Sequence, residues 1–411
     1  MTDDAARAWR AQVALDPEIA YLNTGSYGLL PRPVLAVVTA LREELYRNPV
    51  DFLWRRFGPR LESARERLAG FLAAPPHRLF FALNVSEAIN WVAASLRLAA
   101  PGEIVLTDHE YGAMRWVWER CAARCGLTLR TLVVPMHATT REEVVAELAR
   151  QWRPATRLFF FSHVLHTTGM VLPAAELCAA ARRQGIVTVV DGAHAPGMIP
   201  LHLEQIAADY YCANLHKWLL APLGAGFLYC TAGREELLQP THVSWGWHYD
   251  RSRAEARDGH GGTFRQRAFE FVGSRDLSPW LAVPAAIDFH QAVGPGNIRA
   301  RHLELSDQVR ARLEVVPGVI CVTPQAPELR GGLTAFRLPP HDATTVRRLL
   351  WERHRIEINL VDHPAGPWLR VSTHFYNLPE EIERLGQALP EALPAGMIAS
   401  PDPHHGPAAF Q

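Results

Sequence analysis

The chain has 411 residues, and its 42 basic and 42 acidic side chains leave no formal net charge. A chain of this length usually divides into two domains, and balanced charge argues against a surface for nucleic acid. The sequence has no apolar run of about 18 residues, so we expect no membrane span, and its acidic start is not typical of a signal peptide. The six cysteines form no CxxC pair, which favours a reducing cytoplasm over disulfides or a zinc site.

The sequence begins with a turn-rich segment that contains one predicted amphipathic helix at 31–46. After it, patterns typical of helices alternate with patterns typical of strands. We expect helices at 59–74, 84–97, 111–125, 141–152 and 173–184. We expect strands at 78–82, 103–107, 127–134, 157–162, 186–190, 210–213 and 226–230. This alternation predicts an α/β fold with a mainly parallel seven-stranded sheet sandwiched by helices.

From about residue 281 the rhythm changes. A long helical stretch leads to predicted strands near 318–323, 332–337 and 368–372, and to a helix at 343–354. These elements predict a smaller α+β domain, which the N-terminal segment joins. We therefore expect a large domain at 50–285, a small domain made of 1–49 and 286–398, and a disordered tail at 399–411.

The basic residues are unusual, because 41 are arginines and Lys217 is the only lysine. On a solvated surface an arginine replaces a lysine at little cost. An arginine cannot become a neutral nucleophile, however, whereas a desolvated lysine can. A compositional bias could also leave one lysine by chance, so the residues around Lys217 decide its meaning.

Polar residues follow several of the predicted strands, where ligands collect in open α/β sheets. Asp191 ends the apolar run 187–190. A carboxylate at this place can pair with the protonated ring nitrogen of pyridoxal 5'-phosphate (PLP), whose ring accepts electrons from the Cα of an amino acid. An aspartate that only caps the following turn is the alternative.

Two other strand ends offer groups that suit such a cofactor. Asn84, Val85 and Ser86 open a predicted helix, and Asn84 with Glu87 has the form of a capping box. The free amides of that turn and the Ser86 hydroxyl suit a phosphate, although an ordinary N-cap is the alternative. Tyr111 follows the next strand and can either stack on a flat cofactor or lie at the rim of the site.

Lys217 itself lies at a strand end. The run Asn214-Leu-His216-Lys217 interrupts an apolar stretch, which a packed core does not favour without a reason. His166 and Thr167 follow another strand, and their polar groups can bind a ring hydroxyl or serve a structural role. Lys217 is therefore expected in one layer with an acid, a phosphate-type helix start and an aromatic ring.

At this point the residues resemble a known family. Asp191-Gly-Ala-His194, followed by Asn214-Leu-His-Lys217, resembles the signature of the class V aminotransferases, which are PLP-dependent enzymes of fold type I. The resemblance covers nearly the whole chain, and the further segments that resemble the family are 21–28, 271–276 and 370–377.

The resemblance implies a role for each position. Lys217 would form the internal aldimine with PLP, and Asp191 would pair with the ring nitrogen. Arg370 would bind the α-carboxylate of an amino-acid substrate in a bidentate fork. The further implied cofactor contacts are Asn84, Val85, Ser86, Tyr111, His166, Thr167, His194, Asn214 and His216. The further implied substrate contacts are Tyr27 and Asn23. No metal is expected, and the family implies a homodimer with its active site at the subunit interface, where Ser274 would reach the phosphate of the neighbouring subunit.

Two features bear on the branch of the family. Tyr111 stands where cysteine desulfurases usually have a histidine, and with the segment 243–247 it resembles the isopenicillin N epimerase-like branch. A desulfurase also needs a cysteine on a mobile loop, which in this family precedes the carboxylate arginine, and the stretch 359–369 contains none. Cys321 lies in an apolar strand pattern, and we expect it to be buried. These observations argue against a desulfurase.

The sequence leaves the reaction open between epimerisation or racemisation, β-elimination such as C–S cleavage, and transamination. Epimerisation and elimination both begin when Lys217 removes the Cα proton, and epimerisation then needs a donor on the opposite face, such as Tyr27, His109 or water. A catalytically inactive binding protein and a Schiff-base enzyme without PLP are further alternatives. The intact lysine, acid and arginine argue against the first, and the contexts of Asp191 and Ser86 argue against the second.

Overall fold

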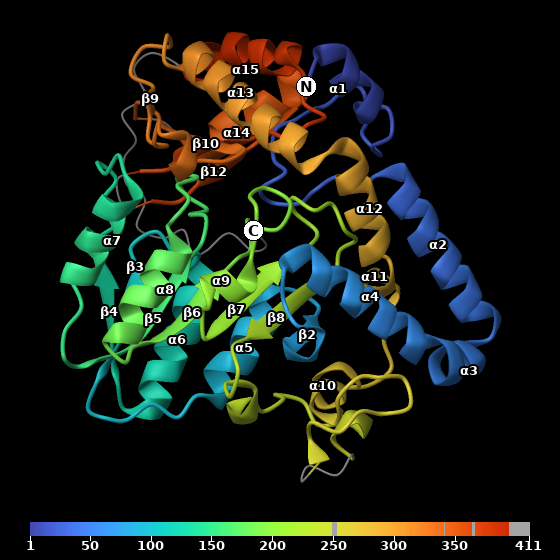
Figure 1. Cartoon of the computed structure of the whole chain (residues 1–411). Helices are drawn as coiled ribbons and strands as arrows, with labels where there is room; N and C mark the ends of the chain where they lie inside the picture. Colours follow the sequence, from blue (N-terminus) through green and yellow to red (C-terminus); the bar gives the residue numbers. More distant parts are fainter. Residues whose placement is uncertain (249–252, 341, 364–365, 394–411) are drawn as a thin grey trace.

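The computed structural model describes residues 1–248, 253–340, 342–363 and 366–393, so the predicted tail at 399–411 lies outside the described residues. Its main feature is a seven-stranded sheet with the order β2-β8-β7-β6-β5-β3-β4, in the lower half of Figure 1. The strands are β2 (Leu79–Ala82), β3 (Glu103–Thr107), β4 (Thr128–Leu132), β5 (Thr156–Ser162), β6 (Val187–Asp191), β7 (Tyr210–Asn214) and β8 (Gly226–Cys230). Strand β8 alone runs antiparallel to the other six strands, so the predicted mainly parallel sheet of seven strands is confirmed.

Both faces of this sheet are apolar, as the uninterrupted hydrophobic strands predict. Phe159 and Phe161 of β5 pack on one side, while Leu158 and Phe160 pack on the other. The first side is covered by α4 (Phe57–Leu72), α7 (Arg141–Arg150), α8 (Ala174–Arg183) and α9 (Leu203–Ile206). The second side is covered by α5 (Val85–Ser95), α6 (Gly112–Cys125) and α10 (Phe264–Glu270). The sheet is therefore the centre of a three-layer sandwich.

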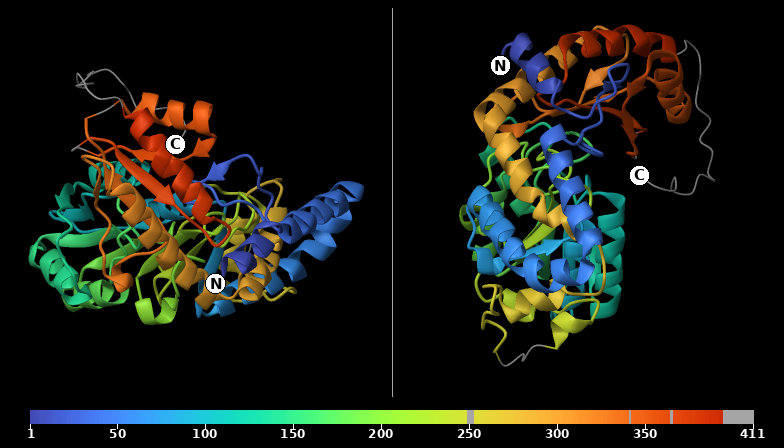
Figure 2. Two further views of the ribbon diagram at one scale, coloured as in Figure 1. Left: turned by 90° about the horizontal axis from the view of Figure 1, so that it is seen from above. Right: turned by 90° about the vertical axis from the view of Figure 1, so that its right-hand side faces the viewer.

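A second, antiparallel sheet lies above the first in Figure 1 and in the right-hand view of Figure 2. Its order is β12 (Asn359–Val361), β13 (Trp368–Ser372), β10 (Leu333–Arg337) and β9 (Ile320–Cys321). It shares an apolar core with α13 (Pro295–Leu313), α14 (Ala343–His354) and α15 (Pro379–Ala392).

The N-terminal segment reaches both parts of the molecule. Strand β1 (Ala20–Tyr21) pairs in parallel with β11 (Ile356–Glu357), next to the small sheet. Helix α1 (Asp3–Arg10) precedes this strand, and α2 (Arg32–Arg47) and α3 (Pro49–Asp51) follow it. Helix α2 lies beside α12 (Val283–Val293), which α11 (Ser278–Leu281) precedes (Figure 2). The domain boundaries given by the sequence remain predictions.

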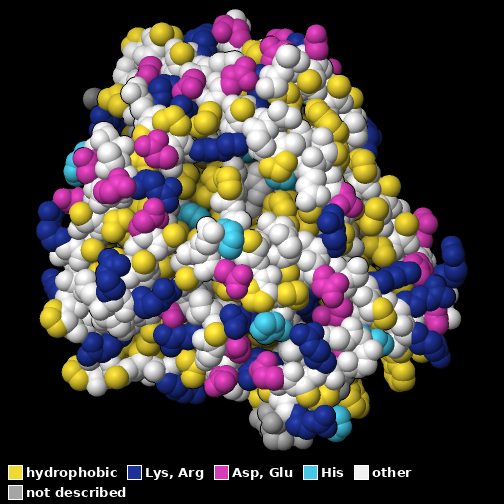
Figure 3. Space-filling model, viewed as in Figure 1, with side chains coloured by type: hydrophobic (Ala, Val, Ile, Leu, Met, Phe, Trp, Pro, Cys, Tyr) yellow, Lys and Arg dark blue, Asp and Glu magenta, His cyan; other side chains and the backbone are white. Residues whose placement is uncertain are grey.

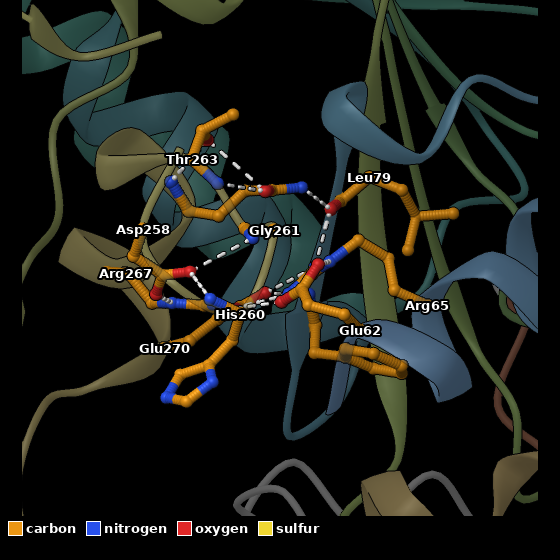
Figure 4. Close-up of polar contacts among 12 residues, drawn as sticks. Glu62, Arg65, Leu79, Asp258, His260, Gly261, Thr263, Arg267 and Glu270 are labelled. Carbon is orange, nitrogen blue, oxygen red and sulfur yellow. Dashed lines mark hydrogen bonds and ion pairs between the residues drawn. The ribbon is translucent and has the colours of Figure 1, made fainter. Parts of the chain in front are cut away.

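A buried ionic network fastens α10 to the edge of the large sheet (Figure 4). Both guanidinium NH groups of Arg65, on α4, donate to Glu270 at 2.7 and 2.8 Å, and Arg65 Nε donates to Glu62 at 3.0 Å. Arg267 donates to Glu62 and Asp258 at 2.7 and 2.6 Å. Since Glu270 also accepts from the backbone of β2, the network fixes the chain just before the segment 271–276.

Charge on the surface is mixed. Basic and acidic side chains are interspersed over the face shown in Figure 3, with apolar side chains between them. In the part of the chain that the structure describes, no helix is long and apolar enough to cross a membrane.

Candidate active site

A cavity of about 560 Å³ opens at the carboxyl ends of β5, β6 and β7 and is closed from the other side by β1, β11, β12, β13 and α14. It brings together most of the side chains that the sequence singled out. Those in its lining are Asn23, Tyr27, Asn84, Val85, Ser86, Tyr111, His166, Asp191, His194, Asn214, His216, Lys217 and Arg370. Thr167 and Ser274 are not among the lining residues.

Lys217 follows β7, and its Nζ lies 3.2 Å from His194 Nε2. The other ring nitrogen of His194, Nδ1, accepts a hydrogen bond from Trp218 Nε1 at 3.2 Å. An indole nitrogen can only donate, so the proton of a neutral His194 is on Nε2 and points at the lysine. Lys217 is then the acceptor, which requires a neutral amine.

The surroundings of Lys217 favour the same form. Burial and the charge of Arg370 together lower the pKa of Lys217 to about 7, against the opposing charge of Asp191. Burial also holds the pKa of His194 well below its usual range, so this imidazole is uncharged. The site thus holds an amine that is available as a nucleophile and as a base near neutral pH.

Asp191 ends β6 beside the lysine. Its Oδ1 accepts a hydrogen bond from the Ala193 backbone at 2.8 Å, which fixes the carboxyl group. Burial raises the pKa of Asp191, while the Ala193 amide and the charge of Lys217 lower it. A buried acid of this kind is stabilised in its ionised form when a cation, such as a protonated ring nitrogen, enters the cavity.

The start of α5 forms another wall. Asn84 is its N-cap and accepts from the Glu87 backbone at 3.0 Å, as predicted, but Glu87 Oε2 accepts from Leu83 rather than from Asn84. Asn214 Oδ1 accepts from the Val85 backbone at 2.9 Å and so joins the end of β7 to this helix. The Ser86 side chain lines the cavity at the positive end of the helix dipole, where an anion is stabilised.

Two histidines complete the polar lining. Burial lowers the pKa of His166 and of His216 to about 3, so both are neutral donors or acceptors. His166 also makes an edge contact with the ring of Tyr111, with centroids 5.6 Å apart. Within the described residues, Nδ1 of each histidine is buried without a hydrogen-bond partner.

Thr167 and His109 lie together behind the cavity lining. Thr167 Oγ1 is 2.7 Å from His109 Nδ1, and both side chains are buried. His109 also stacks near His363, with centroids 5.4 Å apart. Of the two side chains considered as proton donors, Tyr27 therefore lies at the cavity and His109 does not.

Arg370 comes from β13 and points across the cavity toward the large sheet. It donates to Ser26 Oγ at 2.9 Å, to the His166 carbonyl at 3.3 Å and to Asn23 Oδ1 at 3.4 Å. Burial lowers the pKa of Arg370 to about 10, so the guanidinium remains charged at neutral pH. Over the described ranges no carboxylate forms an ion pair with Arg370, and a buried cation without an acid favours an anionic ligand.

The N-terminal turn 23–28 packs directly on the lysine. The Gly28 backbone donates to the His216 carbonyl at 3.0 Å, and a Cβ at Gly28 would lie 2.0 Å from the Lys217 carbonyl oxygen. Only glycine fits at this position. The close approach explains why the opening turn belongs to the site.

Several lining residues were not predicted. Ser162 ends β5, and this strand-end position was the one available signal for it. Tyr21, Gly25, Ser26 and Ala193 lie inside segments that resemble the family, but none of them was assigned a role. The residues without a local signal are Arg347, Glu357, Asn359 and Val361. Most of them reach the cavity through the β1–β11 pair and the small sheet, which are long-range features of the fold.

Pyridoxal phosphate fits this set of residues. The cavity combines an amine, a buried acid, an aromatic ring and a helix start, and the unpartnered nitrogens of His166, His216 and Arg370 can bind a polar ligand. A metal is not indicated by any side-chain cluster, since the described residues contain no group of three His, Cys, Asp or Glu side chains suited to one.

Cys321 is placed away from the cavity. It lies in β9 with its Sγ 3.9 Å from the Thr323 carbonyl, and burial raises the pKa of this thiol. The expectation that Cys321 is buried is wrong, because β9 is a two-residue edge strand that leaves this side chain partly exposed. Its thiol is not among the lining residues of the site.

Known proteins resemble the chain over nearly its whole length. A family model described as aminotransferase class-V matches residues 20–385. The isopenicillin N epimerase of Streptomyces clavuligerus is 51% identical over 383 residues, which are 92% of this chain and 96% of that protein. The isopenicillin N epimerase of Amycolatopsis lactamdurans is 50% identical, over 94% of this chain and 99% of that protein.

Solved structures share the fold. A variant of C-DES with glycine covalently linked to its PLP cofactor has a TM-score of 0.81 at 28% identity, covering 93% of this chain and 99% of that one. The complex of the cystine C–S lyase C-DES with its product cysteine persulfide has a TM-score of 0.80 at 28% identity, covering 92% and 99%. The chain therefore belongs to the class V aminotransferase family of PLP-dependent enzymes.

Proposed function

We propose that this enzyme is an epimerase of the isopenicillin N type, which inverts the configuration at the Cα of an amino-acid group. The observation that carries the proposal is the neutral amine of Lys217 in one cavity with Asp191 and with Arg370, which pairs with no carboxylate of the described residues. The choice of reaction is supported by two relatives of about half-identical sequence, both named isopenicillin N epimerase.

Each of the main cavity residues has a separate role in the proposed reaction. Arg370 binds the α-carboxylate in a fork and so fixes the direction of the Cα–H bond. Lys217 would hold the cofactor until the substrate takes its place, and its free amine would then take the Cα proton, with His194 orienting that amine through the 3.2 Å contact. Tyr27 or a water held beside it returns a proton from the other face. PLP, when bound, withdraws electrons from Cα and makes that proton removable, with Asp191 holding its ring nitrogen protonated.

The cavity has more polar side chains than are needed to bind the amino-acid group that reacts. Arg347, Glu357 and Asn359 line its second wall, away from the strand ends of the large sheet, and Glu357 accepts from Asn23 at 3.2 Å. These polar side chains could bind further groups of a substrate that is larger than a single amino acid, which supports the proposal.

A C–S lyase is the second candidate, supported by the structural similarity to the cystine C–S lyase C-DES. Elimination uses the same first step at Lys217 but needs a leaving group at Cβ and no proton donor on the second face. Transamination is a third outcome of the same first step. Products therefore decide between these reactions.

The test is to incubate the purified holoenzyme with isopenicillin N in deuterated buffer and to analyse the products by chiral chromatography and mass spectrometry. We expect the epimer at the reacting carbon, with deuterium at Cα. Pyruvate together with the released thiol from S-substituted cysteines, without any epimer, would support the lyase instead. A keto acid as the main product would support a transaminase.

We also propose a homodimer that completes the site. Ser274 is exposed, lies outside the cavity lining and follows the segment that the buried network fixes. Trp54 and Trp245 are 80% and 81% exposed, and such aromatic side chains are typical of contact surfaces. Sedimentation velocity should give twice the mass of the chain, and Ser274→Ala should weaken PLP binding without dissociating the dimer.

A cytoplasmic location is our further proposal. All six cysteines are free thiols in the structure, which suits a reducing compartment. Cell fractionation with an antibody against the chain would test it.

A further inference from the structure

Glu110 is a carboxyl group that the proposed reaction does not use, although it lies one residue before Tyr111. It occupies the turn between β3 and α6 and is partly buried. Its Oε2 lies 2.5 Å from Ser162 Oγ, and its Oε1 lies 2.5 Å from Thr107 Oγ1 and 3.1 Å from the Ser162 backbone nitrogen. The carboxyl group therefore holds the end of β5 against the end of β3.

Ser162 connects this carboxyl group to the cavity. It ends β5, lines the cavity, and is the register partner of Asp191 on β6. The side chain that Glu110 holds is thus the immediate neighbour, across the sheet, of the acid that faces the ring nitrogen. The hydrogen on Ser162 Oγ can point only one way, either to Glu110 or into the cavity.

The hydrogen bonds indicate which way it points. The Ser162 amide must donate to Oε1, because a backbone N–H can only donate, and the Thr107 hydroxyl lies 2.5 Å from the same oxygen. Oε1 is therefore the carbonyl-like oxygen of the carboxyl group. A carboxylic hydrogen would then be on Oε2, where it can be donated to Ser162 Oγ.

The surrounding charges favour that hydrogen. In the described part of the chain no Arg, Lys or His forms an ion pair with Glu110. The charged group that faces it from another element is Asp191, a second acid, and its own chain neighbours are His109 and Tyr111. Burial and, to a lesser extent, the charge of Asp191 raise the pKa of Glu110 to about 7, against the opposing hydrogen bonds of Ser162 and Thr107.

We propose that Glu110 is a positioning residue: it is protonated in the active enzyme and donates to Ser162 Oγ, so that the Ser162 hydroxyl donates into the cavity beside Asp191. A donor at this place stabilises the ionised form of Asp191, which is the form that pairs with a protonated ring nitrogen. An ionised Glu110 would instead draw the Ser162 hydrogen away and add a second negative charge. The value of this arrangement for catalysis rests on the proposed function, but the protonation of Glu110 does not.

The first experiment uses the cofactor-free protein. Urea unfolding is measured between about pH 5 and about pH 8 for the wild type and Glu110→Gln, whose amide keeps the donor and the acceptor but cannot ionise. A carboxyl group whose pKa is raised by folding stabilises the protein at low pH, and this contribution is lost as the pH rises through about 7. We expect the wild-type midpoint to fall relative to the Glu110→Gln midpoint over this range. A difference that does not change with pH would overturn the proposal.

The second experiment uses the absorption of bound PLP to report on the cofactor site. The visible absorption of PLP-loaded protein is titrated for the wild type, Glu110→Gln, Glu110→Asp and Ser162→Ala. We expect Glu110→Gln to keep the wild-type spectrum below about pH 7 and to lose the transition near that pH, and we expect Ser162→Ala and Glu110→Asp to shift the spectrum. A Glu110→Gln spectrum displaced as far as that of Ser162→Ala would overturn the proposal. Failure to bind PLP would refute the proposed function, while the urea experiment would still decide the protonation of Glu110.

Discussion

Replacing Arg370 with methionine removes the charge and the hydrogen-bonding fork but keeps much of the aliphatic stem. A hydrogen bond to a charged group contributes about 1.5–3 kcal/mol, so losing a two-bond fork removes about 3–6 kcal/mol of binding to the carboxylate. At about 1.4 kcal/mol for each factor of ten, we expect kcat/KM to fall by about 10²- to 10⁴-fold. The structure adds a second effect, because the charge of Arg370 lowers the pKa of Lys217.

The assay compares the wild type and Arg370→Met on an amino-acid substrate and on its carboxamide. The loss should be large for the acid and small for the amide, since the amide carries no carboxylate for the fork. The pKa of Lys217 in cofactor-free protein should rise above the wild-type value of about 7. Arg348→Met is the matched control, because Arg348 is an exposed arginine that pairs with Glu352 on α14. Equal losses on the acid and the amide would refute the role of Arg370 as the carboxylate site.

Three further predictions concern the cofactor site and its support. Glu270→Gln leaves Arg65 buried without its main partner, and we expect the free energy of unfolding to fall by about 3–5 kcal/mol in urea denaturation; an unchanged midpoint would contradict this. The rate at which cofactor-free protein takes up PLP should rise as the pH increases through about 7, because the Lys217 amine loses its proton there, and a rise only near pH 10 would contradict the low pKa. Tyr111→Ala should weaken PLP binding roughly 2- to 10-fold while Tyr111→Phe should not, as measured by fluorescence titration; equal binding by both variants would exclude stacking.

The alternation of strands and helices made the large sheet predictable. Strand β3 was expected at 103–107 and has these bounds in the structure, because its apolar run lies between clear turn residues. Helix α10 was not expected. Its Arg267 and Glu270 are typical of an exposed face, but they are buried because Arg65 and Glu62 neutralise them from about 200 positions away. The local sequence around α10 does not indicate ion pairs with residues so far away in the chain.

The site residues likewise fall into two groups: those that the local sequence predicts, and those that only long-range contacts bring to the cavity. Asp191 and Lys217 could be predicted, because each follows an apolar strand and strand ends meet at one edge of a parallel sheet. Arg347 and Glu357 could not, since Arg347 lies on α14 and Glu357 on β11, and only the long-range fold brings these two elements to the cavity. The Glu110–Ser162 contact joins the turn after β3 to the end of β5, 52 positions apart in the sequence, and only the register of β5 on β6 shows that it adjoins Asp191.

The central claim is that Lys217 carries the cofactor, and the chain allows an unusually clean test because it has no other lysine. The holoenzyme is reduced with sodium borohydride, digested and analysed by mass spectrometry. We expect one phosphopyridoxyl group, on the peptide that contains Lys217, and none in a folded Lys217→Arg variant. A label on another peptide, or a protein that stays colourless and unlabelled when PLP is added, would contradict the account.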